Sequence, residues 1–100
     1  MEPTAVHFAR TARSLADAAR ARGLDPPTFR SPPRVPGVTR TIRRSSKGVV
    51  VSVVLRDRPW PAVAADMVDG VIAANELTGV EADKARAALW DAVDVAHRAA

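Results

Sequence analysis

The stretch Val38–Trp60, VTRTIRRSSKGVVVSVVLRDRPW, predicts a β-hairpin around which the rest of the chain is organised. A basic run with alternating Thr, Ile and Arg comes first, and a valine-rich run follows it. Between them, Ser45–Gly48 suits a tight turn, because glycine can adopt the positive φ that such hairpin loops require. The sequence therefore predicts two antiparallel strands within about residues 38–56.

The turn also sets the register of the two strands. Pairing outward from it places Ile42 opposite Val51, Arg40 opposite Val53 and Val38 opposite Leu55. Because side chains alternate between the two faces of a strand, one face becomes apolar and the other mixed. The apolar face collects Val38, Ile42, Val49, Val51, Val53 and Leu55, and the mixed face collects Thr39, Thr41, Arg43, Val50, Ser52, Val54 and Arg56.

The second strand is unusually apolar, since six of the seven residues in VVVSVVL at 49–55 are hydrophobic. Such a run is typical of a strand that is covered on both faces or paired on both edges, and two strands alone are only marginally stable. Two arrangements satisfy this requirement. The hairpins of a homodimer could form a shared four-stranded sheet, with Val50 and Val54 at the partner interface, or the proline-rich segment before the hairpin could cover the exposed edge.

Two antiparallel helices are predicted after the hairpin, at about 62–75 and 79–97. Residues 59–61, Pro-Trp-Pro, end the strand, and the first helix has a broad apolar arc with Asp66 and Asp69 on its opposite, water-facing side. Gly70 lies at the margin of the arc, where it permits a close backbone approach. On the last helix, Trp90 lies on the flank, where its indole could lie under Arg86 as a cation–π pair or form a contact surface with a partner.

Before the hairpin, residues 4–22 predict an amphipathic helix that ends at Gly23. Its apolar stripe is mostly alanine, which favours shallow docking. Residues 25–37, DPPTFRSPPRVPG, contain five prolines and predict a semi-rigid spacer. The expected organisation is thus an α+β chain with an N-terminal helix (1–24), a proline-rich linker (25–37) and a hairpin-plus-two-helix domain (38–100).

Composition excludes several classes of protein. The 100 residues include no cysteine, so a disulfide framework, thiol catalysis and a Cys-based zinc site are ruled out. No apolar run approaches 18 residues and the N-terminus lacks an apolar signal core, so we expect a cytoplasmic protein with no membrane contact.

Motifs for catalysis or metal binding are missing as well. His7 and His97 are isolated in the sequence, and the acid pairs on the last two helices lie opposite apolar stripes, where solvated charges belong. Glycine-rich phosphate loops are absent. We therefore predict a non-enzymatic protein with no metal and no cofactor.

Charge is the most informative feature. Residues 1–47 hold ten Arg and Lys against three Asp and Glu, whereas residues 48–100 hold five against eight, so a basic arm precedes an acidic body. Such polarity suggests an acidic partner. No aromatic residue lies between Val35 and Leu55, which favours phosphate contacts over base stacking. The candidate nucleic-acid-binding residues are Arg30, Arg34, Arg40, Arg43, Arg44 and Lys47 at the hairpin, with Arg10, Arg13 and Arg20 on the N-terminal helix.

Arg40 is unusual among these candidates because the predicted register puts it on the apolar face. It could extend its charge to water, pair with Asp66 or Asp69, or indicate an error of register.

The sequence thus favours a small nucleic-acid-binding accessory protein that uses a basic arm and hairpin tip for backbone phosphate contacts. The alternative is a protein–protein adaptor or assembly subunit that oligomerises through the valine-rich hairpin and recognises a larger protein partner.

Overall fold

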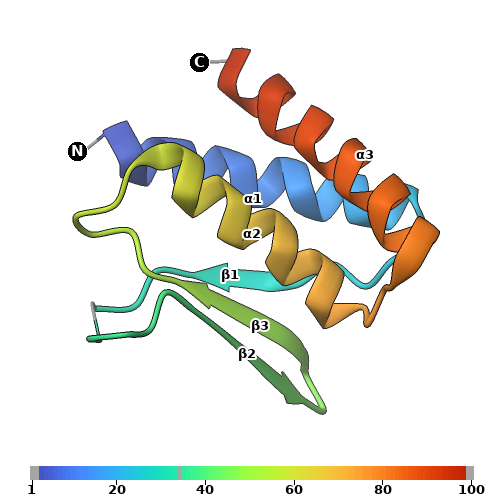
Figure 1. The fold of residues 1–100 in the computed structure, drawn as a ribbon, viewed down its shortest axis with the longest axis horizontal. Coiled ribbons are helices and arrows are strands. Elements are labelled where there is room, and N and C mark those ends of the chain that lie inside the picture. Colours follow the sequence, from blue (N-terminus) through green and yellow to red (C-terminus); the bar gives the residue numbers. More distant parts are fainter. Residues whose placement is uncertain (1–2, 34, 99–100) are drawn as a thin grey trace.

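The computed structural model describes residues 3–33 and 35–98, in which three helices lie on one face of a three-stranded sheet (Figure 1). This confirms the predicted α+β class, with a hairpin packed against the C-terminal helices. The elements in chain order are α1 (Pro3–Ala21), β1 (Thr28–Arg30), β2 (Arg40–Ser45), β3 (Gly48–Val53), α2 (Trp60–Ala74) and α3 (Gly79–Arg98).

The hairpin forms in the predicted register. β2 and β3 are antiparallel, with Ile42 opposite Val51 and Arg40 opposite Val53. Ser45 pairs with Gly48 at the tip, and Gly48 has the predicted positive φ, at 118°. The strands are shorter than the predicted span of 38–56, since β2 begins only at Arg40 and β3 ends at Val53. The predicted pair of Val38 and Leu55 therefore lies outside the strands.

The proline-rich segment is more than a spacer, because its residues Thr28–Arg30 form β1. This strand pairs with β3 in parallel, with Phe29 opposite Val51, so the sheet order is β1-β3-β2. Prolines flank the strand and do not interrupt it, which keeps its backbone amides available for the ladder. The structure thus shows the second of the two arrangements: both edges of β3 are paired within one chain, and its valine density needs no partner.

The core lies between the sheet and the helices. α1 and α2 cover the sheet, and α3 packs on them from the side away from it (Figure 1). α1 docks more deeply than its alanine stripe predicts, since Leu15 and Ala19 are fully buried and Phe8 meets Phe29 edge to face, with ring centroids 6.4 Å apart. Burial of these side chains gives a single core that includes Val51 and Val53 of β3, Met67 and Val71 of α2, and Leu89 of α3.

Gly70 makes the close backbone approach that its position predicts. A Cβ atom added there would lie 2.6 Å from Cγ1 of Val51, well inside van der Waals contact. α2 can therefore lie directly on β3 only because this residue has no side chain.

The ends of α1 and α2 hold the connecting segments in place. α1 ends as predicted, with Gly23 at φ 74° and the amide of Leu24 bonded to the carbonyl of Ala19 at 2.9 Å. α2 begins at Trp60, two residues before the predicted start. Beyond its other end, Asn75 receives a hydrogen bond from the amide of Asp25 (2.8 Å) and returns one to its carbonyl (3.0 Å). These two bonds tie the start of the proline-rich segment to the C-terminal end of α2.

None of the described helices is at once long and apolar enough to cross a membrane.

Candidate nucleic-acid interface

Side chains along β2 alternate between the two faces of the sheet, so its three arginines do not all lie on one face. Arg40 and Arg44 share a face with Ile42, which packs against the core, whereas Arg43 and Thr41 alternate to the other face. No described helix covers that other face of the sheet (Figure 1). Consecutive cations in the sequence therefore have different surroundings.

On the covered side, Arg40 joins an ion cluster at Asp66 of α2. Its guanidinium lies 3.8 Å from one carboxylate oxygen of Asp66, and Arg58 donates to the other at 2.5 Å. Arg58 also donates to the carbonyl of Val54 at 2.9 Å. Of the three explanations for Arg40, the pair with Asp66 is the one observed. Asp66 was expected to face water, but its side chain is only 19% exposed because it lies between the two arginines.

Arg44 is occupied at the end of α2. It donates a hydrogen bond to the carbonyl of Ala74, the last residue of that helix, and lies 3.7 Å from the carboxylate of Glu76. A cation at this end stabilises the carbonyl groups that lack helical partners and complements the helix dipole. Arg44 thus has an internal role that its sequence context does not reveal.

The uncovered face of the sheet brings cations from separate segments together. Val50 of β3 lies between Thr28 of β1 and Arg43 of β2, and Ser52 of β3 lies between Arg30 and Thr41 in the same way. Each edge strand therefore contributes one arginine to this face. Lys47 extends this surface at the hairpin tip. The surface contains a shallow hollow of about 650 Å³ lined by Thr28, Arg30, Thr41, Arg43, Ser45, Lys47, Val50 and Ser52. We call this surface the open sheet face.

The open sheet face is chemically uniform. Each of the described residues that line it is a cation, a hydroxyl-bearing side chain or Val50, and none of these is acidic or aromatic. Arg30, Arg43 and Lys47 are exposed, and their side-chain charges have no hydrogen-bond or ion-pair partner among residues 3–33 and 35–98. Three cations without competing carboxylates, among hydroxyl donors, are suited to bind the oxygens of phosphate groups.

The arginines of α1 lie elsewhere. Arg10 and Arg13 line a separate hollow against Val95 and Ala96 of α3, and Arg20 pairs with Asp17 at 3.1 Å on the surface. The structure therefore does not join these three cations to the open sheet face. Arg34, the remaining basic candidate, lies outside the described residues.

The predicted partner-interface residues also have different positions. Val50 is half-buried in the middle of the open sheet face. Val54 is only 3% exposed, and its amide donates to the carbonyl of Thr39 at 3.0 Å, so the segment before β2 already lies against it. Trp90 is partly buried and packs against the core.

The fold brings together a cluster of aromatic rings that cannot be recognised in the sequence. His7 of α1 and His97 of α3 stack with ring centroids 4.7 Å apart, and Trp60 lies 5.7 Å from His7. These histidines look isolated in the sequence because they come from opposite ends of the chain. The described residues contain no group of three or more His, Cys, Asp or Glu that could hold a metal ion.

Fold and surface together define a small α+β protein with a cationic, hydroxyl-lined sheet face left open. In comparisons with known proteins, no family model, curated protein or solved structure matched this chain.

Proposed function

We propose that this protein is a small, non-enzymatic nucleic-acid-binding protein that contacts backbone phosphates through its open sheet face. One observation supports this most directly: Arg30 of β1 lies on the same uncovered surface as Arg43 and Lys47, and among the described residues no carboxylate lines that surface. The proposal includes fewer hairpin residues than the sequence suggests, because Arg40 and Arg44 have partners inside the chain.

The chemistry of the face favours recognition of the backbone over recognition of bases. Cations contact phosphates and release condensed counterions, and the hydroxyls of Thr28, Thr41 and Ser52 can donate hydrogen bonds to phosphate oxygens. Base stacking needs aromatic platforms, and none lines this face. Binding should therefore depend strongly on salt and weakly on sequence.

The test compares two triple variants that remove the same charge from different surfaces. Arg30→Ala/Arg43→Ala/Lys47→Ala empties the open sheet face of cations, and Arg10→Ala/Arg13→Ala/Arg20→Ala removes three from α1. Affinity for duplex DNA, single-stranded DNA and single-stranded RNA is measured by fluorescence anisotropy over a range of salt concentrations. Three phosphate contacts correspond to a slope of log K against log[salt] of about −2.7 for duplex and about −2.1 for a single strand.

We expect the sheet-face variant to bind about tenfold to a hundredfold more weakly at low salt and to lose most of this slope. The α1 variant should keep the slope of the unmodified protein, and thermal melting checks that both variants are folded. Equal losses in the two variants would contradict the proposal, because overall charge and not the open sheet face would then drive binding. An unmodified protein that binds neither DNA nor RNA would favour the adaptor alternative.

A further inference from the structure

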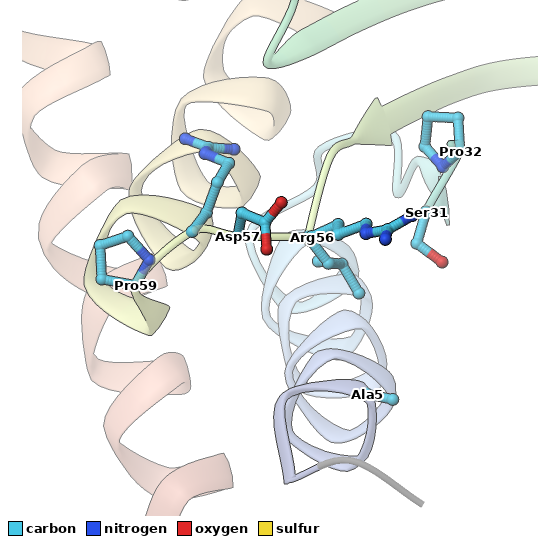
Figure 2. A pocket seen from close by; sticks show the side chains of 8 residues that line it. Ala5, Ser31, Pro32, Arg56, Asp57 and Pro59 are labelled. Atoms are coloured by element: carbon cyan, nitrogen blue, oxygen red, sulfur yellow. The ribbon is translucent and has the colours of Figure 1, made fainter. Parts of the chain in front are cut away.

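Another hollow lies at the carboxyl ends of the parallel strands β1 and β3. It has a volume of about 820 Å³ and is formed where residues just after each strand meet the first turn of α1 and the start of α2 (Figure 2). This volume falls within the range of sites that hold small organic ligands. Its lining residues are Ala5, Ser31, Pro32, Leu55, Arg56, Asp57, Arg58 and Pro59.

The two arginines of this hollow differ in what holds them. Arg58 is fixed by the carboxylate of Asp66 and the carbonyl of Val54. Arg56 is exposed, and its guanidinium has no hydrogen-bond or ion-pair partner among the described residues. In Figure 2 the side chain of Arg56 extends toward Ser31, across the hollow. Arg56 is therefore the cation that a ligand can reach.

A guanidinium beside a hydroxyl is suited to an oxyanion. Arg56 can donate two parallel hydrogen bonds to a pair of phosphate oxygens, and the hydroxyl of Ser31 can donate a third. α2 begins next to Pro59, so the positive end of its dipole lies at the rim and adds to the attraction.

The remaining walls indicate what is attached to the phosphate. Pro32, Leu55 and Pro59 provide apolar surface, which suits a planar base. We propose that this hollow binds the phosphate monoester of a nucleotide, with Arg56 and Ser31 holding the phosphate. The site is independent of the open sheet face, because a free nucleotide needs no strand on the sheet.

The first experiment titrates the full-length protein with AMP and with adenosine, by calorimetry and by amide chemical shifts. We expect AMP to bind saturably with shifts around residues 31 and 56, and adenosine, which lacks the phosphate, to bind at least tenfold more weakly. Arg56→Ala should weaken AMP binding about tenfold or more, Ser31→Ala should weaken it less, and Arg56→Lys should fall between because it keeps the charge but not the paired donors. Arg13→Ala, an exposed arginine on another surface, is the matched control.

Absence of saturable AMP binding, or equal losses in Arg56→Ala and Arg13→Ala, would overturn the assignment. A second experiment separates two sources of the phosphate by comparing oligonucleotides with a 5′-phosphate and with a 5′-hydroxyl. If the 5′-phosphate strengthens binding to the unmodified protein but not to Arg56→Ala, the hollow holds a strand end. If only AMP depends on Arg56, it holds a free nucleotide.

The two proposals can fail separately. The sheet-face triple variant should bind AMP with unchanged affinity, because none of its three residues lines this hollow. Loss of AMP binding in that variant would contradict the assignment of the phosphate to Arg56.

Discussion

Arg43 and Arg44 are neighbours in the chain, yet they lie on opposite faces of the sheet. Arg44 is bound to the last carbonyl of α2 and to Glu76, whereas Arg43 lies on the open sheet face with its charge toward solvent. The same contrast separates Arg40, which is paired with Asp66, from Arg30. Strand alternation assigns each cation to its face, and the helices that cover only one face then decide which cations are neutralised.

A count of arginines near the hairpin therefore overestimates the candidate binding surface. Six basic residues at and before the hairpin are candidates in the sequence, but two of the five described ones stabilise α2. A helix with its C-terminal carbonyls near a strand attracts a cation from that strand, because those carbonyls have no helical partners. Of the five described basic candidates at and before the hairpin, Arg30, Arg43 and Lys47 remain free for a ligand.

The largest expected effect contrasts two adjacent valines of β3. Val51 is fully buried under α2, so Val51→Ala should lower the free energy of unfolding by about 2 kcal/mol through lost burial and an unfilled cavity. Val50 is half-buried on the open sheet face, and Val50→Ala should cost less than about 1 kcal/mol. Urea denaturation followed by circular dichroism measures both, and equal losses would contradict the assignment of the faces.

A substitution at Gly70 tests the contact between α2 and Val51 from the helix side. Gly70→Ala would gain about 1 kcal/mol from helix propensity on an open surface, but its new methyl group would meet Val51. We expect a net loss of about 1–2 kcal/mol in the unmodified protein and a smaller loss in a Val51→Ala background, which leaves room for the methyl group. Additive losses would show that the two residues are not coupled.

An intermediate effect is expected at Asp66, compared with Asp69 on the same helix. Asp66 is 19% exposed and contacts both Arg40 and Arg58, so Asp66→Ala should cost about 1–2 kcal/mol because it removes the carboxylate that both partly buried cations face. Asp69 is 46% exposed and lies 3.4 Å from Arg86, and Asp69→Ala should cost less than about 1 kcal/mol. Chemical denaturation of the two variants gives the comparison; a larger loss for Asp69→Ala would contradict the proposed ion cluster.

The smallest effect on stability, and the sharpest test of the two faces, is expected for Arg44 and Arg43. Arg44→Ala removes the cation at the end of α2 and should cost about 0.5–1 kcal/mol, while leaving DNA affinity nearly unchanged. Arg43→Ala should change stability by less than about 0.5 kcal/mol but weaken DNA binding severalfold. Melting curves of both variants should show the larger loss of stability in Arg44→Ala, and anisotropy titrations should show the larger loss of DNA affinity in Arg43→Ala. Equal DNA affinities for the two would remove the distinction between the faces.

Features determined by neighbouring residues could be predicted from the sequence. Ser45–Gly48 specifies a hairpin turn, the turn sets the pairing of Ile42 with Val51, and Gly23 ends the first helix. The close approach at Gly70 also follows from its place on the apolar arc. These outcomes depend on local backbone geometry and on side-chain periodicity, which the order of residues fixes directly.

Tertiary structure alone decided the rest. Residues 28–30 became a parallel strand because the free edge of β3 lay within reach of a segment fixed by Asn75, and the prolines flanking it hid this outcome in the sequence. The open sheet face, the hollow at Arg56 and the stacked His7 and His97 all join residues from distant segments. Such contacts depend on which elements pack together, so the sequence determined the helices and the hairpin of this protein, and their packing decided the added strand β1 and which charges stay free.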